Sequence, residues 1–167
     1  MRRLIALVYR ELQHLAHHHR YRWDGEPTPG TTSLVHEAYT RIVSQPEPRY
    51  ASRGEFFKLA SRAMRSVLVD SARYHQRRKR GGGVVHVPAE DSLLVSEQRF
   101  DELLALDRAL DRLEREHPRL VQVTECRCFA GLSVEETAQA LNVSTATVKR
   151  DWNVARAMLY RDMGTDE

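Results

Sequence analysis

A dense group of positive charges lies in the middle of the chain. Residues 61–80 contain seven Lys and Arg side chains and a single acid, Asp70. The cations are Arg62, Arg65, Arg73, Arg77, Arg78, Lys79 and Arg80, and the aromatic residues around them are Tyr50, Phe56, Phe57 and Tyr74. Arginines that follow phosphates, beside rings on which bases stack, are typical of proteins that bind single-stranded or melted DNA. We predict nucleic-acid binding here. The alternative is a solvated basic face, and Phe56 and Phe57 are expected in the core in either case.

A second candidate for DNA chemistry is "GLSVEETAQALNVSTATVKRDWNVARAMLY", residues 131–160. Ser133 and Glu136 have the S-x-x-E spacing of a capping box, which starts a helix. Asn142 tolerates the left-handed conformation of a tight turn, and Ser144 can cap a second helix. Two short helices joined in this way predict a helix-turn-helix, whose second helix enters the major groove of DNA. The residues presented there would be Ser144, Thr145, Thr147, Lys149, Arg150 and, nearer the DNA backbone, Arg156. An αα-hairpin that only packs is the alternative.

Three neutral hydroxyls, Thr31, Thr32 and Ser33, stand before a pattern that predicts a helix over residues 34–44. The apolar face of this helix looks suited to a partner, and it comprises Leu34, Val35, Ala38, Tyr39, Ile42 and Val43. An N-cap at Thr32 or Ser33 would explain a hydroxyl here and would contribute roughly 1 kcal/mol.

Other chemistry finds little support in the sequence. There is no phosphate-binding glycine loop and no nucleophile paired with a base, so we expect neither an enzyme nor a small-molecule substrate or cofactor. His14 and His18 share a helix face but have no carboxylate or thiol pattern beside them, and no metal site is predicted. Cys126 and Cys128 are too close for a disulfide framework, which fits a cytoplasmic setting.

Periodicity places these residues on helices throughout, and the fold class is predicted as all-α. Apolar residues recur at helical spacing over residues 4–19, 34–44, 54–78 and 100–116, and beyond Pro118. Gly81, Gly82, Gly83 and Pro88 interrupt the pattern, so we expect two small helical domains, residues 1–80 and 99–167, joined by a flexible linker at 81–98. No apolar run is long enough to span a membrane.

Charge divides the chain in the same place. Residues 1–89 carry 16 Lys and Arg against 7 Asp and Glu, a balance of +9, whereas residues 90–167 carry 10 against 16, a balance of −6. The basic half is therefore a candidate for binding a polyanion. The acidic segment at 100–116 could hold the second domain against this basic surface in the free protein.

Taken in order, these features resemble the extracytoplasmic-function (ECF) sigma factors of bacterial RNA polymerase. The resemblance covers almost the whole chain. It rests on "YRELQHLA", "LVHEAYTRIV", "FFKLASRAMRSVLVDSARYHQRRKRGGG" and the helix-turn-helix segment, wording close to an ECF-like subgroup linked to Ser/Thr kinases. It implies that residues 1–80 are sigma region 2, a three-helix bundle that binds the β′ clamp coiled coil of the core polymerase and opens the −10 element. It also implies that residues 99–167 are region 4, which reads the −35 element.

One departure from the family pattern concerns polymerase binding. Family members carry acids before the leucine of the clamp-binding helix, where this chain has Gly30, Thr31, Thr32 and Ser33. The expected polymerase contacts are Leu34, Val35, Glu37 and Tyr39. We hypothesise that a Ser/Thr kinase supplies the missing charge by phosphorylating Thr32, or else Thr31 or Ser33. The alternative function is a stand-alone helix-turn-helix regulator that does not act through core polymerase.

Overall fold

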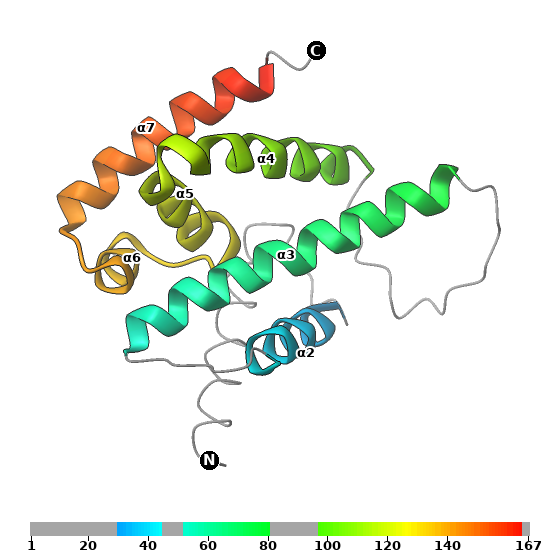
Figure 1. The fold of residues 1–167 in the computed structure, drawn as a ribbon, viewed down its shortest axis with the longest axis horizontal. Coiled ribbons are helices and arrows are strands. Elements are labelled where there is room, and N and C mark those ends of the chain that lie inside the picture. The colour runs from blue at the N-terminus through cyan, green and yellow to red at the C-terminus, as the bar shows by residue number, and fades with distance from the viewer. Residues whose placement is uncertain (1–29, 45–51, 81–96, 165–167) are drawn as a thin grey trace.

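The computed structural model describes residues 30–44, 52–80 and 97–164 (Figure 1). Their elements are α2 (Gly30–Val43), α3 (Arg53–Arg80), α4 (Glu97–Glu116), α5 (Pro118–Thr124), the π-helical turn η2 (Glu125–Phe129), α6 (Val134–Leu141) and α7 (Thr145–Gly164). The prediction of an all-α fold is confirmed, and these three segments contain no strand. The helix expected at 4–19 and the glycine-rich part of the linker lie outside the described residues.

Helix α3 is the long central element. Its 28 residues run across the middle of the molecule, with α2 on one side and α4, α5 and α6 on the other (Figure 1). Helix α7 packs on α4, α5 and α6. The apolar core is continuous across the three described segments, and its largest fully buried side chains include Ile42, Met64, Leu110 and Phe129. Phe56 and Phe57 are buried in it, as expected.

The start of α2 differs from the sequence expectation. The helix begins at Gly30 rather than Leu34, so the three hydroxyl residues Thr31, Thr32 and Ser33 lie in its first turn and are not N-caps. The apolar pattern of this segment starts at Leu34, and the first buried side chain described in α2 is Val35. A first turn made of glycine and hydroxyl residues carries no apolar residue that periodicity could detect.

A π-helical turn follows α5. Gly131 adopts φ 68°, and the N–H of Leu132 donates to the carbonyl of Cys126 at 2.9 Å, which ends the helical segment. The turn packs on α3. It places the Glu125 carboxylate and the Cys126 thiol against the centre of α3, where the Ser61 hydroxyl lies 3.8 Å from the Cys126 sulfur.

Candidate nucleic-acid and polymerase interfaces

The helix-turn-helix has the geometry that its sequence predicts. The N–H of Glu136 donates to Ser133 Oγ at 3.0 Å, and the N–H of Ser133 donates to Glu136 Oε2 at 2.8 Å, so the capping box of α6 is complete. Asn142 ends α6 with φ 53° and ψ 49°. The N–H of Thr147 then donates to Ser144 Oγ at 3.1 Å and caps α7. These local bonds set how α7 leaves the turn.

Helix α7 presents polar residues at its start and buries its other face. Thr145, Lys149 and Arg150 are exposed. The hydroxyl groups of Ser144 and Thr147 form a hydrogen bond of 2.9 Å with each other. The buried face comprises Val148, Asp151, Ala155 and Leu159. The exposed residues fit a helix that offers two cations and a hydroxyl to a polyanion.

A buried acid in α7 was missed by the sequence analysis. The Asp151 carboxylate has a side-chain exposure of 5% and accepts from Arg119 at 2.6 Å and from Arg150 at 3.4 Å. The guanidinium of Arg156 lies 5.9 Å from the centre of the Trp152 ring, in cation–π range. Asp151 thus ties α7 to α5 and also orients Arg150. The signal for this contact in the sequence was that Asp151 directly follows Arg150.

Six of the seven predicted −10 residues of α3 fall into three groups. Arg62 is exposed and lies 3.4 Å from Glu114, and the half-exposed Arg73 lies 3.1 Å from Asp107. Arg77 is exposed and donates to the carbonyl of Arg73. The backbone of Arg78, Lys79 and Arg80 forms the last turn of α3, and their side chains lie outside what the structure describes.

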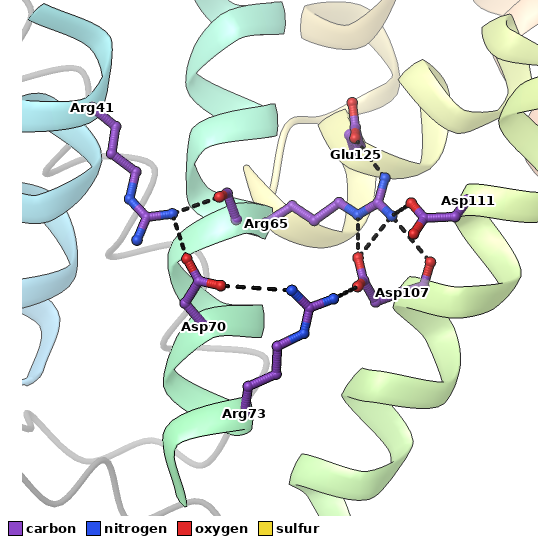
Figure 2. Close-up of polar contacts among 8 residues, drawn as sticks. Arg41, Arg65, Asp70, Arg73, Asp107, Asp111 and Glu125 are labelled. Atoms are coloured by element: carbon purple, nitrogen blue, oxygen red, sulfur yellow. Dashed lines mark hydrogen bonds and ion pairs between the residues drawn. The ribbon is translucent and has the colours of Figure 1, made fainter. Parts of the chain in front are cut away.

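Arg65 is the exception, because its guanidinium is buried among acids of α4 and η2 (Figure 2). It donates to Asp107 Oδ1 at 2.9 and 2.7 Å, to Asp111 Oδ1 at 2.7 Å and to Glu125 Oε1 at 3.1 Å. Burial alone would lower the pKa of Arg65, but the hydrogen bonds that it donates to Asp107 and Glu125, together with the charges of these two acids, outweigh burial and raise the pKa. Burial raises the pKa of Glu125 and outweighs the opposing effect of Arg65.

The expected polymerase-binding residues lie on different faces of α2. Val35 is buried in the core, whereas Glu37 is exposed and accepts from Arg41 at 2.7 Å. Tyr39 is half-buried and packs against the core. The backbone of Leu34 is helical, and its side chain is not described. Glu37 and Tyr39 are therefore the members of this set that the structure places at the surface.

The other sequence candidates form no site in the described segments. Within residues 30–44, 52–80 and 97–164, no group of three His, Cys, Asp or Glu side chains could hold a metal ion. His14 and His18 lie outside these segments. Cys126 is buried, and burial raises the pKa of its thiol to about 11. Across the same segments, no helix combines the length and apolar character that crossing a bilayer requires.

A comparison with protein families decides the assignment. The model of the family described as "ECF sigma factor" matches residues 1–165. The chain belongs to the ECF sigma factor family. No curated protein and no solved structure matches it significantly.

Membership explains the two candidate DNA surfaces. ECF sigma factors bind the core of RNA polymerase and promoter DNA, and they direct the polymerase to promoters. They are transcription initiation factors rather than enzymes.

Proposed function

We propose that this ECF sigma factor reads promoters through two surfaces and acts in the cytoplasm. The start of α7, with Thr145, Lys149 and Arg150, contacts the −35 element, while Ser144 and Thr147 cap the helix and Arg156 lies nearer the DNA backbone. The basic residues of α3 contact the −10 element. In this proposal residues 1–80 act as region 2, 81–98 as the linker and 99–167 as region 4. The observation that carries the −35 assignment is the capped helix-turn-helix with its exposed basic start.

The −35 assignment is tested by replacing Arg150 and Lys149 with alanine. Arginine can read a guanine edge through two hydrogen bonds, and losing such a pair costs about 1–3 kcal/mol, or roughly tenfold to a hundredfold in affinity. Transcription from the chain's own promoter with core polymerase should fall accordingly. Arg108→Ala is the control, because Arg108 is an exposed arginine of α4. Equal losses in all three variants would contradict the assignment.

We also propose that polymerase binding by α2 depends on phosphorylation in its first turn. No acid lies in that turn, and Glu37 is one turn further along. The N-terminus of a helix carries a partial positive charge and favours an anion. A phosphoryl group on Thr32, or on Thr31 or Ser33, adds about −1.5 to −2 charges there and supplies what a basic clamp surface requires. The partner that this mechanism implies is a Ser/Thr protein kinase.

The switch is tested with four forms of the protein. Thr32→Glu or Thr32 phosphorylated by a kinase should bind core polymerase more tightly than the unmodified chain, and Thr32→Ala should remain weak even after kinase treatment. Thr40→Glu is the matched control, because Thr40 is an exposed threonine of the same helix that lies far from its first turn. Tight, transcription-competent binding by unmodified protein would refute the switch and would leave the family assignment intact.

A gel shift separates this proposal from the stand-alone regulator. A sigma factor needs core polymerase for tight, specific promoter binding, whereas a self-sufficient helix-turn-helix regulator does not. Specific binding without polymerase, unchanged on adding it, would favour the regulator.

A further inference from the structure

Two charged stripes face each other between α3 and α4. The basic stripe is formed by three arginines on one face of α3, Arg62, Arg65 and Arg73, and the neutral Gln76 lies one turn further along. The acidic stripe is one face of α4, formed by Asp101, Asp107, Asp111 and Glu114. The stripes pair in antiparallel order, Arg62 with Glu114 at 3.4 Å, Arg65 with Asp111 and Asp107 at 2.7 Å each, Arg73 with Asp107 at 3.1 Å and Gln76 with Asp101 at 2.6 Å. Three arginines of α3 are thus paired with acids of α4.

The centre of this contact is closed to solvent. The side chains of Arg65, Asp107 and Glu125 have exposures of 8%, 9% and 8%. Separating a buried ion pair leaves charges unpaired, which costs much more than the intact pair contributes. The network therefore selects this arrangement of α3 against α4 and η2 over other packings, and Arg65 cannot reach a phosphate while it persists.

Close backbone packing supports the same arrangement independently of charge. Gly54, in the first turn of α3, lies against the end of α6, the first helix of the helix-turn-helix. A Cβ added at Gly54 would lie 2.9 Å from the carbonyl oxygen of Ala140 and 3.2 Å from its Cα. These neighbours are backbone atoms, so they cannot rotate away. A glycine here permits the two halves to approach.

We propose that the free protein is autoinhibited, with the acidic stripe covering the basic stripe until the two halves separate. Three of the arginines proposed for the −10 element, Arg62, Arg65 and Arg73, are paired in the closed form. DNA phosphates must displace carboxylates that are already in place, so free protein binds single-stranded DNA weakly. The masking rests on the proposed −10 role of α3, whereas the closed contact itself does not.

The first test reverses charge on the acidic stripe. The double variant Asp111→Lys with Glu114→Lys alters two partly exposed acids and spares the buried Asp107. The control is Glu102→Lys with Glu116→Lys, which makes the same charge change at exposed positions of α4 that form no ion pair with α3 in the described segments. The stripe variant and its control have the same net charge. The general attraction of a more basic protein for DNA is therefore the same in both.

Two properties of the full chain are measured without polymerase. Circular dichroism first checks that the stripe variant and its control have the same helix content. Small-angle scattering should give a larger radius of gyration for the stripe variant than for its control. A labelled single-stranded DNA of mixed sequence should bind the stripe variant about tenfold more tightly than the control, because freed arginines add phosphate contacts. Identical size and affinity in the two variants would overturn the proposal. Expansion without tighter binding would refute the masking, whereas the proposed −10 role of α3, which operates with core polymerase, would stand.

The second test opens the contact without changing charge. Gly54→Ala should expand the protein and strengthen its binding to the same DNA, because the added Cβ meets backbone of α6. Gly164→Ala is the control, since a Cβ there meets nothing within 4 Å. A Gly54→Ala protein as compact and as weak in DNA binding as the control would count against the closed form.

Discussion

Asn142 makes the turn between the two helices of the helix-turn-helix. Its φ of 53° and ψ of 49° place it in the left-handed region, where its N–H donates to the carbonyls of the last turn of α6. Side chains with a branched Cβ are strained in this region, whereas asparagine and glycine adopt it readily. Asn142 therefore allows the tight turn that joins the 8-residue α6 to the 20-residue α7.

Replacing Asn142 by valine should cost about 1–2 kcal/mol of unfolding free energy, because the left-handed conformation strains a β-branched residue. Asn142→Gly should lie close to the wild type, since glycine has no Cβ. Urea unfolding of the three proteins measures the difference. A valine variant as stable as the glycine variant would show that the turn relaxes to another conformation.

At the scale of elements, α6 is too short to be stable alone. It has 8 residues, well below the length at which an isolated helix forms in water. Its stability comes from the capping box and from packing in a small apolar cluster of Val123, Ala138 and Val148, beside Trp152. The placement of α7 thus depends on a helix that must be capped and packed.

Ser133→Ala should destabilise the protein by about 1 kcal/mol, because the Glu136 N–H loses its acceptor. Ser133→Thr keeps the hydroxyl and should restore most of the loss. Thermal unfolding of both variants tests the cap. If alanine and threonine were indistinguishable at this position, the packing of α6 alone would account for its stability.

At the scale of the whole molecule, a buried charge network joins the halves. Arg65, Asp107 and Glu125 come from α3, α4 and η2, and Arg41 extends the network to α2 through Asp70 at 2.9 Å (Figure 2). Removing one partner of such a buried network costs more stability than the intact network contributes. The network also makes the packing of the halves sensitive to pH through Glu125.

The pKa of Glu125 is raised above its ordinary value of 4.5, chiefly by burial. The folded protein therefore takes up this proton at a higher pH than the unfolded chain. As pH falls from neutral through the raised pKa toward 4.5, the wild type should gain stability relative to Glu125→Gln, and the difference should level off below 4.5. Urea unfolding of both proteins across this range is the measurement. If the unfolding free energies of the two proteins changed in parallel with pH, the raised pKa of Glu125 would be contradicted.

The sequence by itself determined the local features of this ECF sigma factor. The capping box, the turn at Asn142 and the cap at Ser144 join residues three or four positions apart, so their types and spacing contain the whole interaction. The basic run of α3 and the buried Phe56 and Phe57 followed from helical period and composition. The start of α2 at Gly30 could not be predicted in this way, because its first turn contains no apolar residue.

Only the tertiary structure decided what each arginine of α3 contacts. Arg65 and Arg73 are both arginines of one basic run, yet one is buried and the other half-exposed. Arg65 meets Asp107 across 42 positions and Glu125 across 60. Contacts at such separations arise from the packing of α3 on α4 and η2, and the burial that sets their energies exists only once those helices have come together.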